Sequence, residues 1–73
     1  MNPANLIKMA NQIGAFFEAM PDHEQAVQDT AAHIQNTWEP RMRAALLQHV
    51  CQFGDAELKT VVRDALPLVK NSS

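Results

Sequence analysis

Three histidines and one cysteine are the side chains in this sequence best suited to metal binding or nucleophilic chemistry. His23, His33 and His49 are too far apart in the chain to form a local metal motif. Cys51 follows His49 by two positions, and residues two apart on a helix point to different faces. We therefore expect His49 to lie at the edge of the core with a hydrogen-bond partner, and Cys51 to behave as a small half-buried hydrophobic residue.

The carboxylates are the next candidates for catalysis, and they mostly fall outside the apolar stripes. They are Glu18, Glu24, Asp29, Glu39, Asp55, Glu57 and Asp64. Helix capping and solvated faces account for such positions. The sequence also lacks a His-Glu-x-x-His, a Cys-x-x-Cys and a glycine-rich phosphate loop. We expect no catalytic residue, no metal ligand and no cofactor-binding residue in this chain.

Composition narrows the class of protein further. The chain has 73 residues and 47% apolar residues, which predicts one small domain over residues 1–73. A net charge of −2 gives no electrostatic reason to bind nucleic acid or an anionic membrane. A single cysteine allows no internal disulfide, and the N-terminus lacks the pattern of a signal peptide. These features predict a cytoplasmic protein whose marginal size favours docking or self-association.

Proline and glycine divide the chain into four expected helices. Their ranges are about 3–20, 22–39, 40–53 and 55–66, and residues 70–73 are expected to fray. Pro67 should end or kink the last helix. The apolar residues repeat at helical spacing, and the stripes of the first and third helices comprise Leu6, Met9, Ala10, Ile13, Phe16, Phe17 and Met20, and Met42, Ala45, Leu46, His49, Val50 and Phe53. The predicted fold is all-α, a compact bundle of three to four short helices.

The first helix carries a small-residue flank that another backbone could approach. Gly14 in a helix interior costs about 1 kcal/mol relative to alanine. Together with Ala10, it forms a low surface beside Ile7. We interpret Ile7 and Gly14 as candidate partner contacts, with packing against the second or third helix as the alternative.

The corner between the second and third helices is another candidate contact. Trp38 and Pro40 precede Arg41 and Arg43, and cations in a first helical turn oppose the helix dipole. Trp and Arg are also enriched in binding hot spots. Leu47 lies roughly 130° from the centre of its helix's apolar stripe on ideal geometry. Each candidate also has an explanation that needs no partner. Trp38 would then simply be a core residue, the two arginines would be solvated, and Leu47 would pack on the fourth helix or be a single exposed leucine.

Two strings resemble those of a known family. Residues 11–22 read NQIGAFFEAMPD, and residues 38–46 read WEPRMRAAL. With residues 32–34 between them, they resemble the delta subunit of NAD-dependent, molybdenum-containing formate dehydrogenases. The resemblance spans about residues 4–50 and is looser after Gly54.

The resemblance implies a non-catalytic accessory subunit that binds, assembles or stabilises a cytoplasmic formate dehydrogenase complex. Its partners would be the larger subunits of that complex, and those subunits would hold the molybdenum cofactor, the iron–sulfur clusters and the flavin. The alternative from the residues alone is a free-standing helical homodimer or adaptor unrelated to formate metabolism.

Overall fold

The first helix begins as its sequence predicts and ends earlier. In the computed structural model, which describes residues 2–70, α1 spans Pro3–Phe17. The Asn2 side chain caps it by accepting a hydrogen bond from the Ala4 amide. The expected end at Met20 is wrong, because residues 18–21 form the turn that reverses the chain toward the next helix.

The third helix has the expected boundaries, and the second begins as expected after Asp22 but ends two residues earlier than residue 39. Helix α2 spans His23–Thr37, and the Asp22 carboxylate accepts hydrogen bonds from the amides of Glu24 and Gln25. Helix α3 spans Pro40–Phe53 and ends at Gly54, whose φ of 89° is a conformation that suits glycine.

The fourth helix starts later than its apparent cap predicts. Helix α4 spans Thr60–Ala65, and a turn of 3₁₀ helix, η1, follows over Leu66–Leu68. The expected start after Asp55 is wrong because Asn11 of α1 holds the intervening turn. Its side chain accepts from the Lys59 amide at 2.9 Å and donates to the Glu57 carbonyl at 2.9 Å. The expected break at Pro67 is confirmed.

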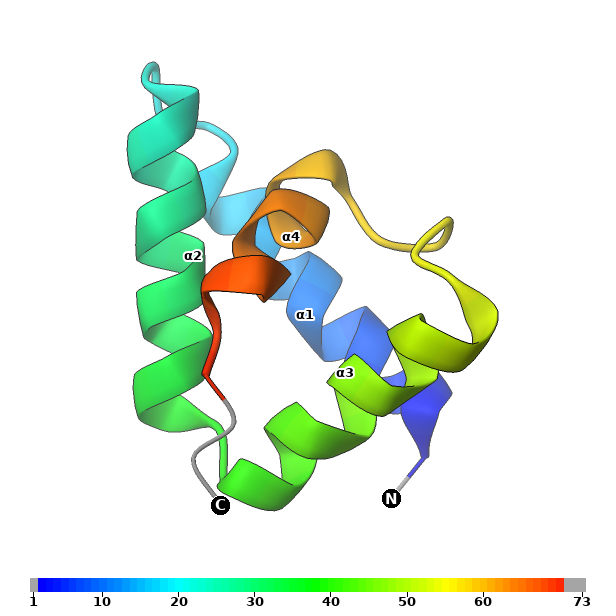
Figure 1. The fold of residues 1–73 in the computed structure, drawn as a ribbon. Coiled ribbons are helices and arrows are strands. Elements are labelled where there is room, and N and C mark those ends of the chain that lie inside the picture. The colour runs from blue at the N-terminus through cyan, green and yellow to red at the C-terminus, as the bar shows by residue number, and fades with distance from the viewer. Residues whose placement is uncertain (1, 71–73) are drawn as a thin grey trace.

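Figure 1 shows α4 lying against α2 and α1 and η1 lying against α2, while α3 crosses α1 on another side. The buried core includes residues from all four α-helices and η1: Leu6, Ile7, Ala10, Ala26, Val27, Ala31, Ile34, Trp38, Leu46, Leu58, Val61, Val62, Ala65, Leu66 and Val69. The radius of gyration is 11.1 Å, about the value expected for a compact chain of this length. The all-α class and the small compact bundle are confirmed.

Several residues of the predicted stripes do not reach the core. Phe16 and Phe53 are each 75% exposed, so their assignment to the core is wrong. Cys51 is exposed rather than half-buried. Within residues 2–70, no helix is long and apolar enough to cross a membrane.

Candidate functional site

The small-residue flank of α1 is covered by the molecule's own fourth helix. Gly14 and Ile7 are both buried. A Cβ atom added at Gly14 would lie 2.6 Å from Cγ2 of Val62 and 3.0 Å from Cγ1 of Val61. The close approach anticipated from the sequence therefore takes place, and the approaching element is α4 rather than α2 or α3.

Trp38 and Arg43 together close the corner between α2 and α3. The Trp38 residue is only 6% exposed, and Arg43 only 5%. The Arg43 guanidinium donates to the carbonyls of Trp38 at 2.6 Å, Gln35 at 3.1 Å and Lys70 at 3.3 Å. Arg43 thus satisfies carbonyl groups at the C-terminal end of α2, and its hydrogen bonds in this structure are intramolecular.

The other candidate contacts lie nearer the surface. Pro40 and Arg41 are exposed in the first turn of α3. Leu47 is half-buried, packs against the core and lies beside a shallow depression that Leu66 and Pro67 also line. Of the seven predicted contacts, Pro40 and Arg41 are therefore exposed, and Leu47 is half-buried.

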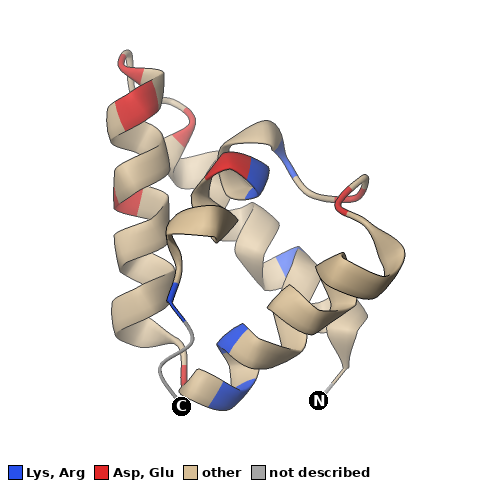
Figure 2. Ribbon diagram, viewed as in Figure 1, with Lys and Arg blue, Asp and Glu red and all other residues tan. Residues whose placement is uncertain are grey.

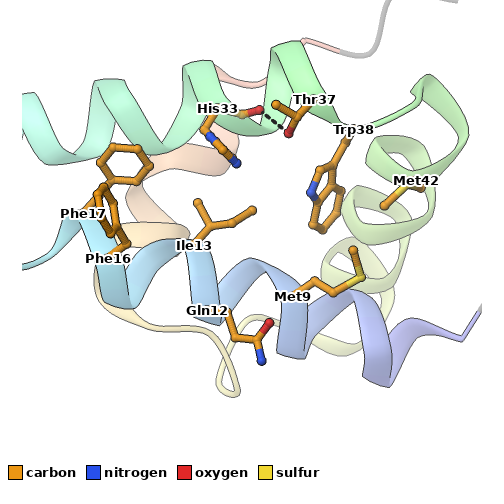
Figure 3. A pocket seen from close by; sticks show the side chains of 9 residues that line it. All are labelled: Met9, Gln12, Ile13, Phe16, Phe17, His33, Thr37, Trp38 and Met42. Carbon is orange, nitrogen blue, oxygen red and sulfur yellow. Dashed lines mark hydrogen bonds between the residues drawn. The ribbon is translucent and has the colours of Figure 1, made fainter.

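A wide apolar groove lies between α1, the end of α2 and the start of α3 (Figure 3). It has a volume of about 640 Å³. Its lining residues are Met9, Gln12, Ile13, Phe16, Phe17, His33, Thr37, Trp38 and Met42. Of the candidate contacts predicted from the sequence, Trp38 also lines the groove, and its buried ring borders the end of the groove next to α3.

Aromatic rings form one end of the groove. The Phe16 and Phe17 rings meet edge to face with centroids 5.0 Å apart, and the Phe17 ring lies 5.9 Å from the imidazole of His33. Met9 and Met42 line the opposite end, as Figure 3 shows. Methionine side chains are flexible and polarizable, so this end can adapt to the shape of a ligand.

The lining contains no Asp, Glu, Lys or Arg. Its polar side-chain groups are those of Gln12, His33 and Thr37 and the indole N–H of Trp38, and the Thr37 hydroxyl already donates to the His33 carbonyl at 2.6 Å. Figure 2 shows acidic residues at the start of α2 and basic residues at the start of α3. The groove is therefore suited to an apolar surface rather than to a charged small molecule.

Sequence reasoning placed Met9, Ile13, Phe16 and Phe17 in the core and so missed the groove. The stripe of α1 covers close to half of the helix circumference, which is more than one packing face needs. Phe16 and Phe17 are adjacent, so they point about 100° apart and serve two surfaces. The width of this apolar stripe was therefore the sequence signal that could have revealed a second apolar surface on α1.

Other groups capable of chemistry are scattered. Within residues 2–70, no three His, Cys, Asp or Glu residues cluster so that they could hold a metal ion. His23 Nε2 lies 2.9 Å from Asp64 Oδ2, and this exposed pair links the start of α2 to α4. His49 is half-buried against the Phe53 ring, with centroids 5.0 Å apart.

The fold and the groove define a class: a small all-α protein with an uncharged apolar groove on its surface. The chain belongs to the NADH-dependent formate dehydrogenase delta subunit family, whose model matches residues 5–66. The match covers both strings on which the resemblance rests and confirms it. Comparison with curated proteins and with solved structures gave no match.

Proposed function

We propose that the chain is a non-catalytic accessory subunit that binds the larger subunits of a cytoplasmic formate dehydrogenase complex and assembles or stabilises it. Family membership supports this proposal, since a delta subunit implies other subunits. In the proposal, those subunits hold the molybdenum cofactor, the iron–sulfur clusters and the flavin.

One observation indicates which surface of the chain contacts the larger subunits. Phe16 presents a ring that is 75% exposed at the edge of an uncharged groove lined with aromatic and methionine side chains. A single exposed apolar residue needs no explanation, whereas a contiguous apolar patch marks an interaction site. We propose this groove as the surface that contacts the larger subunits.

Co-purification tests the accessory role. A tagged copy expressed with the larger subunits should retain them on an affinity column, and deletion of the chain should lower the yield or stability of the active complex. Failure of the chain to associate, together with unchanged formate oxidation after deletion, would reject the proposal. A purified chain that oxidises formate by itself would reject its non-catalytic part.

A further inference from the structure

The dimensions of the groove suit a short helix. Met9 and Phe17 line its two ends along α1, and eight residues of helix rise about 12 Å. Apolar residues at positions i, i+3 or i+4, and i+7 of a second helix span about 10 Å. Two to three turns of an amphipathic helix would therefore cover the groove from the methionine end to the phenylalanine end.

The walls favour a helix over an extended peptide. Both long walls are α-helices, and the interior amides and carbonyls of helices bond within their own helix. An extended segment would find no free edge to pair with, so its backbone groups that face the groove would have no protein partner. A helix satisfies those groups internally and offers the groove only side chains.

Charged residues distinguish the two ends of the groove. Asp29 lies one turn before His33 on the same face of α2, and Asp22 lies near that face at the start of the helix. Arg41 lies in the first turn of α3, just beyond the end of the groove that Trp38 lines. Because Arg41 is two residues before Arg43 on the helix, its side chain points about 200° away from that of the buried Arg43. Glu39 offsets part of this positive charge. One end is therefore acidic, and the other carries an exposed cation (Figure 2).

We infer that the groove receives an amphipathic helix of a larger subunit in a fixed direction. The positive N-terminal end of that helix lies toward Asp29 and Asp22, and its negative C-terminal end lies toward Arg41. The apolar face of the partner helix covers Phe16, Phe17 and the two methionines of the groove. Charged side chains at the two ends of the partner helix face the opposite charges of Asp29 and Arg41. This inference rests on the proposed function, because it needs a partner subunit.

Charge reversal tests the electrostatic part. Asp29→Lys and Arg41→Glu should each weaken binding to the purified larger subunits by about three- to tenfold at low salt, and the loss should shrink in high salt. Glu57→Lys and Arg63→Glu are controls of matched charge change, since both residues are exposed and lie away from the groove, Glu57 in the turn before α4 and Arg63 on α4. They should bind within about twofold of the wild type.

Circular dichroism should show all four variants folded, and Asp29→Asn replaces Asp29→Lys if that variant unfolds. Equal binding by the Asp29 and Arg41 variants and the controls, at every salt concentration, would overturn the directional inference. Wild-type chain that fails to bind the larger subunits would overturn the proposed function as well, so the two failures can be told apart.

Photo-crosslinking tests the direction. A benzoylphenylalanine at position 29 should label residues nearer the N-terminus of one partner helix, and the same group at position 41 should label residues about two to three turns further along it. Crosslinks in the reverse order, in an extended segment, or in a second copy of this chain would overturn the inference. The same probe at position 57 should give no labelling of that helix.

Discussion

Two arginines two positions apart illustrate how much a residue's environment decides its role. Arg41 and Arg43 have the same side chain and the same unfavourable place in the first turn of α3. Arg43 is buried and donates to carbonyls of Gln35, Trp38 and Lys70, whereas Arg41 is exposed. In this structure Arg43 therefore holds the corner between α2 and α3 together, whereas the Arg41 side chain is exposed to solvent.

Alanine substitutions should separate the two residues. Arg43→Ala leaves carbonyls of a buried corner without donors, and it should lower the free energy of unfolding by about 3 kcal/mol or unfold the chain. Arg41→Ala removes no such bond and should change stability by less than about 0.5 kcal/mol. Urea denaturation followed by circular dichroism measures both. Similar losses from the two substitutions would contradict the different roles.

Helix α4 is short and packs mainly against α2, and two contacts with α1 fix how the chain enters it and how closely it approaches α1. Asn11 bonds the turn before α4, and Gly14 allows the helix to approach closely. The sequence predicted a longer helix, from about residue 55, because local propensity takes no account of a side chain arriving from α1. The sequence did predict the starts at Pro3, Asp22 and Pro40, where the cap or proline acts on its own helix.

Gly14→Ala should destabilise the fold despite the better helix propensity of alanine. The gain is about 1 kcal/mol, whereas overpacking against the stiff, fully buried Val62 costs about 1–3 kcal/mol. We expect a net loss of about 1 kcal/mol by thermal or urea denaturation. In a Val62→Ala background, Gly14→Ala should cost less than it does in the wild-type chain. A stabilised Gly14→Ala variant would show that α4 does not approach α1 this closely.

Asn11→Ala should loosen the turn that precedes α4. It removes one donor and one acceptor that hold Glu57 and Lys59, so we expect a loss of about 1–2 kcal/mol. Hydrogen exchange should rise first at the Lys59 amide. Asn5→Ala, an exposed change on the same helix, is the control and should be nearly neutral. Unchanged exchange at Lys59 would contradict the role of Asn11.

At the scale of the whole molecule, the core and the groove divide the apolar residues of α1 between them. Leu6, Ile7 and Ala10 face the core, while Phe16 and Met9 face outward. The amphipathic pattern alone predicted the all-α fold, but it could not make this division because one wide stripe serves both surfaces. Of the seven candidate contacts predicted from the sequence, only Trp38 lines the groove.

The central claim is that the groove binds the larger subunits, and a pair of phenylalanines tests it most directly. Phe16 and Phe53 are equally exposed, but only Phe16 borders the groove. Affinity for the purified larger subunits should fall at least about tenfold for Phe16→Asp and stay within about twofold for Phe53→Asp, with both variants folded. Equal binding by the two variants, or a loss only with Phe53→Asp, would contradict the claim.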